Sequence, residues 1–158
     1  MTHLHSGVVL AVLSFSLGVP AQSTQKAAPM TEARGTFDVT LKPQPTDSAL
    51  GRMSIDKQFH GDLEGVSKGE MLAAGTAVKD SAGYVAMEKV TGTLHGKKGE
   101  FILQHSGTMN RGAPSLALAV VPDSGTGELV GLSGTMSIDI KDGKHFYTFK
   151  YAITKAPS

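Results

Sequence analysis

From residue 33 to residue 153 the chain is a series of short runs in which apolar and polar residues alternate, and clusters rich in glycine separate the runs. A period of two is typical of β-strands with one buried face, whereas amphipathic helices repeat about every 3.6 residues. We distinguish about eight such runs, and few of the connections are long enough for the crossovers of a parallel sheet. The pattern therefore predicts an all-β protein whose antiparallel sheet closes on itself as a barrel.

The first run shows the alternation most clearly. Phe37, Val39 and Leu41 share one face, and polar residues occupy the other. Proline cannot donate a hydrogen bond to a neighbouring strand, so we expect Pro43 and Pro45 to end this strand. The first run is thus predicted to be a half-buried strand.

Two later runs add detail. Residues 115–121 are almost all apolar, which predicts a strand that is buried on both faces or that lines a ligand cavity. Residues 144–153 follow Asp142-Gly143, a typical tight hairpin turn. This last run places most of the chain's tyrosine on one face, which consists of His145, Tyr147, Phe149 and Tyr151.

The beginning of the chain resembles a signal peptide. Residues 1–21 contain no Lys, Arg, Asp or Glu, and the apolar residues 8–17 lead to Val19-Pro20-Ala21, a sequence that a signal peptidase cleaves. The amino-terminal region carries His3 and His5 in place of the usual Lys or Arg. We expect cleavage after Ala21 and a secreted or periplasmic protein that has no membrane association afterwards.

The remaining chain is predicted to hold one domain. Residues 22–32 are rich in Gln, Ala, Thr and Ser without periodicity, which predicts a flexible tether. Residues 33–155 then form a single β-barrel domain, a length at which one hydrophobic core suffices.

Composition excludes several classes of function. The chain has no cysteine, which rules out disulfides, a thiolate nucleophile and cysteine-based zinc sites. Its 15 Lys and Arg residues balance 14 Asp and Glu residues, and tryptophan is absent, so we expect no nucleic acid partner. We also expect no cofactor and no metal, because the histidines lack a ligand spacing. The composition leaves a homo-oligomer open.

Three motif matches are better explained by strands and turns. The segment 65–69 matches G-x-S-x-G, but no helix follows to form a nucleophile elbow. Ser54 and Lys57 match S-x-x-K, yet on a strand their side chains point to opposite faces. The segment 124–127 lacks the lysine and the helix of a phosphate-binding loop.

Four charged or titratable residues share faces with apolar residues: Lys57, Glu70, Glu88 and His105. An ionisable group in an apolar cavity has a shifted pKa and can act as an acid or a base, so these four are the candidate catalytic residues. The alternative is that each lies on the solvent face or forms a structural ion pair. The runs 63–74 and 84–95 leave this open, because either face could be the core. The candidate ligand contacts are Phe59, Tyr84, Gln104 and Tyr147.

Several segments resemble a bacterial domain-of-unknown-function family whose members have the barrel of plant allene oxide cyclase. The resemblance covers residues 33–153, and its most specific segments are 56–65 (DKQFHGDLEG), 69–71 (GEM), 103–107 (LQHSG) and 124–129 (SGTGEL). It implies an eight-stranded antiparallel barrel with a central cavity, lipocalin-like in shape. It does not imply the plant reaction, because no catalytic position can be matched.

Three functions follow as hypotheses. The first is a module that binds a small apolar molecule in the barrel cavity. The second is a cofactor-independent isomerase or cyclase that acts on an apolar substrate, with a glutamate as base or electrostatic stabiliser. The third is a structural or interaction protein whose barrel is filled by side chains. The position of the four candidate residues relative to one cavity is the observation that separates these hypotheses.

Overall fold

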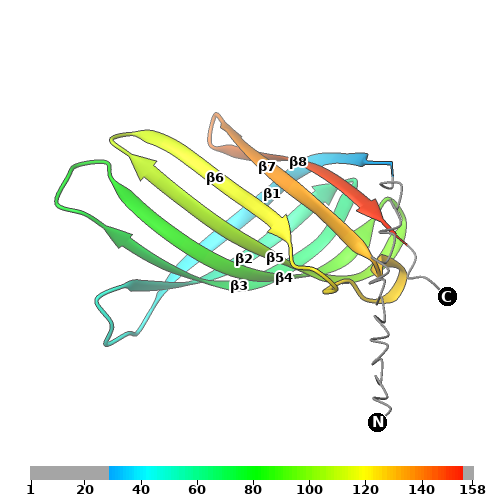
Figure 1. Cartoon of the computed structure of the whole chain (residues 1–158), viewed down its shortest axis with the longest axis horizontal. Helices are drawn as coiled ribbons and strands as arrows, with labels where there is room; N and C mark the ends of the chain where they lie inside the picture. Colours follow the sequence, from blue (N-terminus) through cyan, green and yellow to red (C-terminus); the bar gives the residue numbers. More distant parts are fainter. Residues whose placement is uncertain (1–28, 155–158) are drawn as a thin grey trace, which may run out of the picture.

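The computed structural model describes residues 29–154 as one closed barrel of eight antiparallel strands. Each strand pairs with its neighbour in sequence, and the first strand pairs with the last, as Figure 1 shows. The predicted all-β barrel is therefore confirmed. The strands are β1 (Thr31–Gln44), β2 (Gly51–Gly61), β3 (Leu63–Gly75), β4 (Ala82–Leu94), β5 (Lys97–Asn110), β6 (Ala113–Val120), β7 (Leu132–Lys141) and β8 (Lys144–Ile153), with a single-turn helix, η1 (Gly127–Leu129). Within residues 29–154, no helix is long and apolar enough to cross a membrane.

Strand β1 is longer at both ends than the sequence predicts. It begins at Thr31, inside the expected tether, because β8 offers a backbone partner there: Thr31 lies opposite Tyr151. It continues through Pro43, which lies opposite Met53 of β2. Pairing with β8 ends at Phe37, so Pro43 has a neighbouring strand on one side only, a position in which proline is tolerated. The expected leader, residues 1–21, lies outside the described residues.

Strand β6 alternates, so the expectation that both its faces are buried is wrong. Leu118 and Val120 face the interior and are buried, whereas Ala117 is exposed. The outward positions hold alanines, which look apolar in sequence but expose too little surface to require burial. The alternative expectation, that this strand lines a cavity, agrees with the position of Leu116 described below.

The two ends of the barrel differ. One end carries the β2–β3, β4–β5 and β6–β7 connections together with η1, and the other carries the remaining hairpins (Figure 1). At the first end, here the closed end, large side chains fill the interior, and the Phe101 and Phe149 rings stack with centroids 5.9 Å apart. The fully buried residues here include Leu63, Leu94, Phe101, Leu129, Leu132 and Phe149.

The barrel wall is weakest between β6 and β7. Among the described residues these two strands pair only at Ala119 and Thr135, whereas β4 and β5 pair from Ala82 to Leu94. From the single pair, β6 and β7 diverge towards the end that carries the β5–β6 and β7–β8 turns (Figure 1). We call this the open end. The interior is thus tightly closed at one end and more loosely bounded at the other.

Candidate functional site

Three of the four candidate catalytic residues meet inside the barrel. Lys57 on β2, Glu88 on β4 and His105 on β5 have relative exposures of 8%, 1% and 4%. The Lys57 Nζ donates a hydrogen bond to Glu88 Oε1 at 3.1 Å, and His105 Nε2 lies 3.5 Å from the same oxygen. We call these three residues the ionic cluster. Its centre is the carboxylate of Glu88.

A glycine on the intervening strand lets the cluster form. Glu88 lies opposite Gly69 of β3, so its carboxylate must pass over β3 to reach Lys57 on β2. A Cβ atom at Gly69 would lie 3.1 Å from Glu88 Cβ and 2.3 Å from the backbone oxygen of Met87. The missing side chain at Gly69 therefore leaves the space through which Glu88 reaches Lys57.

The cluster holds Glu88 ionised. Burial by itself raises the pKa of Glu88, but the close contact with His105 and the positive charge of Lys57 outweigh it, and the pKa is lowered overall. The Lys57 ammonium also lies 4.8 Å from the centre of the Phe37 ring, a cation–π distance. Lys57 and Glu88 thus form a buried ion pair with no net charge.

Three buried polar atoms at this site lack a hydrogen-bond partner: Ser67 Oγ, Glu88 Oε2 and His105 Nε2. Glu88 Oε2 lies 3.0 Å from Lys57 Nζ, which is an ion-pair distance without hydrogen-bond geometry. Ser67 lies directly opposite Lys57 in the β2–β3 pair. An unpartnered buried polar atom costs about 1–3 kcal/mol, so these atoms leave hydrogen-bonding capacity unused.

A cavity of about 500 Å³ occupies the open end. Apolar side chains supply most of its wall, and Tyr84 is its aromatic member. The residues that define it include Met71, Ala73, Tyr84, Met109, Leu116 and Ile138. Residues of β3, β4, β5, β6 and β7 line the cavity. It therefore lies against both β6 and β7, the two strands that share a single residue pair.

Tyr84 links the open-end cavity to the ionic cluster. Its ring lies over Gly107 of β5, where a Cβ atom would be 2.1 Å from the ring. Burial raises the pKa of the Tyr84 phenol, and the negative charge of Glu88 raises it further. The phenol therefore lines the cavity and lies within electrostatic reach of Glu88.

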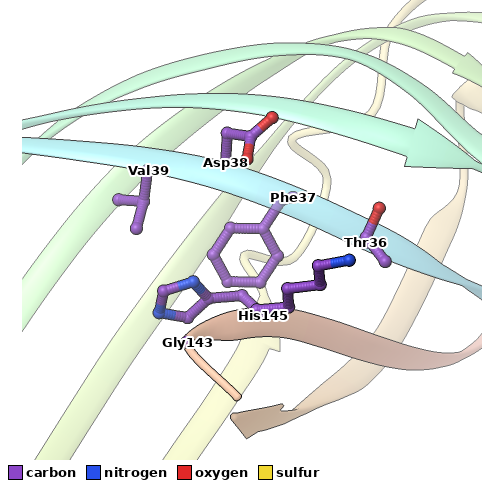
Figure 2. Close-up of a pocket in the computed structure, with 7 residues that line it drawn as sticks. Thr36, Phe37, Asp38, Val39, Gly143 and His145 are labelled. Carbon is purple, nitrogen blue, oxygen red and sulfur yellow. The ribbon is translucent and has the colours of Figure 1, made fainter. Parts of the chain in front are cut away.

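A smaller hollow of about 390 Å³ lies where β1 passes the β7–β8 hairpin. Figure 2 shows the His145 ring beside the Phe37 ring, with Val39 close by and Asp38 directed away from them. The two rings stack with centroids 5.0 Å apart. Since Phe37 also contacts the Lys57 ammonium, this aromatic pair forms part of the wall around the ionic cluster.

The fourth candidate catalytic residue, Glu70, does not join the cluster. It lies on the outer face of β3, where Arg52 donates two hydrogen bonds to its carboxylate at 2.9 and 2.7 Å. The Arg52 guanidinium lowers the pKa of Glu70 through these bonds. Glu70 thus matches the alternative in the sequence analysis, since it lies on the solvent face in an ion pair. The Lys57–Glu88 contact also matches that alternative, as a structural ion pair.

The four candidate ligand contacts are dispersed. Tyr84 lines the open-end cavity, whereas Gln104 is exposed on the outer face of β5. Phe59 is part of the filled core. The Tyr147 hydroxyl accepts a hydrogen bond from the backbone N–H of Leu63 at 2.8 Å, which ties β8 to the start of β3. Sequence reasoning did not identify Ser67, Leu116 or Ile138 as site residues.

No group of three or more His, Asp or Glu side chains within residues 29–154 is arranged to hold a metal ion. The ionic cluster contains one carboxylate and one imidazole, with a lysine ammonium where a third ligand would stand. An ammonium group cannot donate a lone pair to a metal. The side chains of the ionic cluster can donate and accept hydrogen bonds.

The fold and the site define a closed antiparallel barrel with a filled end, an apolar cavity at the open end, and a buried ion pair between them. Over residues 33–151 the sequence matches the family described as "Protein of unknown function (DUF3224)", and the chain belongs to this family. The predicted membership of a domain-of-unknown-function family is thereby confirmed.

One solved structure illustrates the family fold. The crystal structure of a DUF3224-family protein of unknown function from Shewanella oneidensis MR-1 is similar to this chain, with 52% sequence identity and a TM-score of 0.79. The match covers 81% of this chain and 100% of that chain. A comparison with curated proteins gives no match.

Proposed function

We propose that the barrel binds a small, mostly apolar molecule in its open-end cavity. The observation that supports this proposal is the cavity of about 500 Å³ with apolar walls and one polar aromatic group, Tyr84. Small-molecule sites are concave and mostly apolar, with a few polar groups that fix the orientation of the ligand. Side chains fill the interior at the closed end, whereas the open end keeps this cavity, which disfavours a purely structural barrel.

Two features of the sequence extend this proposal. The resemblance to the barrel of plant allene oxide cyclase supports a barrel with a central cavity, although no reaction is carried over. The signal-peptide pattern in residues 1–21 supports binding in a secreted or periplasmic setting. The ligand is therefore proposed to be a molecule met outside the cytoplasm.

Filling the cavity should abolish binding. Ala73 lines the cavity, and Ala74 is the next residue on β3 and is exposed on the outer face. We expect Ala73→Trp to weaken binding of the environment-sensitive probe 1-anilinonaphthalene-8-sulfonate or of 1-octanol at least about tenfold, because the indole occupies the space of the ligand. Fluorescence titration and displacement measure this change.

Ala74→Trp is the matched control, since it adds the same side chain on the other face of the same strand. It should bind both probes as the unaltered protein does. Equal binding by the two variants would place the probe outside the cavity and contradict the proposed site.

The ionic cluster favours a second candidate function, a cofactor-independent isomerase. Glu88 is buried and ionised, which is the form a general base needs to remove a proton from carbon, and Tyr84 supplies a hydroxyl at the cavity side. We expect the protein to speed exchange of the α-hydrogens of 2-octanone for deuterium in D₂O, with Glu88 taking the proton and returning a deuteron to the enolate. NMR follows this exchange.

Glu88→Gln should abolish the acceleration, because an amide cannot accept the proton. Glu100→Gln makes the same change on the outer face of β5, where Glu100 pairs with Lys89 at 2.7 Å, and should leave the exchange rate unchanged. If the unaltered protein does not exceed the rate in buffer, the isomerase function fails and the binding function is unaffected.

A further inference from the structure

Resting on the proposed binding function, we infer that the ligand is an apolar molecule that ends in an uncharged hydroxyl group, and that the ionic cluster with Ser67 recognises this group. The hydroxyl would lie beyond Tyr84, towards the closed end, while the apolar chain fills the open-end cavity. Glu88 and Ser67 are the recognition residues, and Tyr84 is the cavity residue on the same strand as Glu88.

The buried atoms without hydrogen-bond partners indicate which hydrogen-bonding groups the ligand must have. Glu88 Oε2 is an acceptor without a hydrogen-bond donor, and Ser67 Oγ is a hydroxyl without any partner. Ser67 and Glu88 have relative exposures of 2% and 1%, so bulk water does not solvate their side chains. A hydroxyl both donates and accepts, and can therefore satisfy the carboxylate and the serine together.

The charges of the cluster argue against an ionic end group. Lys57 and Glu88 neutralise each other, so the site offers no net charge to offset the desolvation of an ion. A carboxylate would face the negative charge of Glu88, and an ammonium would face the positive charge of Lys57. A hydrocarbon would leave Ser67 Oγ and Glu88 Oε2 without a hydrogen-bond partner.

The interior between the cavity and the cluster has small residues at the required positions. Along β4, the small residue Ala86 separates Tyr84 from Glu88, and along β5 the next inward residue after His105 is Gly107, which the Tyr84 ring covers. Inward-facing residues on one strand are about 6.6–7 Å apart. Glu88 therefore lies two such steps from Tyr84 along β4, and His105 lies one step from Gly107 along β5. An unbranched chain entering past Tyr84 brings its terminal group to this depth.

The test compares three probes of equal length: 1-octanol, octanoate and octylammonium. For the unaltered protein we expect 1-octanol to bind about tenfold more tightly than either ion, measured by displacement of a fluorescent probe, because one to two net hydrogen bonds supply a factor of this size. Ser67→Ala and Glu88→Gln should each reduce the preference. Glu100→Gln, on the outer face, should retain the full preference.

The outcomes separate this inference from the function on which it rests. If no probe binds to the unaltered protein, both the binding function and the inference fail. If all three probes bind equally, or if octanoate binds best, the inference alone is overturned. It is also overturned if Ser67→Ala, which keeps the ion pair and is not expected to disturb folding, retains the preference for 1-octanol.

Discussion

Glu88→Ala is expected to destabilise the protein by about 3–5 kcal/mol, the largest effect of any single substitution considered for this barrel. The alanine leaves the Lys57 ammonium, which is 8% exposed, in the interior without its carboxylate. Urea unfolding followed by circular dichroism measures the change in the free energy of unfolding.

The double variant Lys57→Met/Glu88→Leu is the control for this result. It removes both charges and fills their space with apolar side chains, so its stability should lie close to that of the unaltered protein. If the double variant is as unstable as Glu88→Ala, the loss comes from packing and not from an unpaired charge.

The pH dependence of the same measurement has a definite sign. Because folding lowers the pKa of Glu88, its ionised form stabilises the folded protein above the pKa of the unfolded chain, about 4.3 for glutamate. This contribution is lost as the pH falls through the lower pKa of the folded state. The stability difference between the unaltered protein and Glu88→Ala should therefore be largest at neutral pH and narrow in acid.

Gly69→Ala is expected to cost about 1–3 kcal/mol, the usual range for overpacking, although alanine is normally the better residue in a strand. The new methyl group would lie 2.3 Å from the Met87 backbone oxygen and 2.8 Å from Glu88 Cα, so the β3–β4 pair must separate or Glu88 must move. Movement of Glu88 also breaks its contact with Lys57. Urea unfolding measures the loss, and binding of 1-octanol should weaken in the same variant.

Gly75→Ala is the matched control on the same strand. A Cβ atom at Gly75 meets no other atom within 4 Å, so this variant should be as stable as the unaltered protein or more stable by about 0.4–1 kcal/mol. If both glycine variants have the same stability, the close approach of β3 and β4 at Gly69 does not constrain the site.

The inward orientation of two members of the ionic cluster could be predicted from the sequence, because their neighbours on the same face are apolar. Lys57 lies between Ile55 and Phe59 on its face, and His105 follows Phe101 and Leu103. A period of two then puts both side chains inside once those apolar residues form the core. The sequence therefore predicts that both side chains lie in the interior, but it does not predict which residues they contact.

The position of Glu70 could not be decided in the same way. Both faces of β3 mix polar and apolar residues, so the alternation itself does not say which face is buried. The register settles it: Lys57 lies opposite Ser67, and opposite residues share a face, so Ser67 points inward and Glu70 outward. That register depends on the geometry of the turn after Gly61, which the sequence shows only approximately.

The ends of β1 and the open-end cavity depend on contacts between strands distant in sequence. Pro43 lies within β1 because β8 does not extend that far, and no residue near Pro43 indicates this. Similarly, nothing in 113–120 or 132–141 indicates that these two strands meet at a single pair. Local patterning predicts strands, but their lengths and gaps follow from the closure of the whole barrel.

The single pair between β6 and β7 changes the shape of the enclosed space. In an eight-stranded barrel with all strands fully paired, the cross-section is just wide enough for side chains. Divergence of two strands adds circumference at one end without adding a strand, so the wall tapers as a cone does. Eight strands can therefore enclose a closed end filled by side chains and an open end with a cavity. The Lys57–Glu88 ion pair lies between these two parts of the interior.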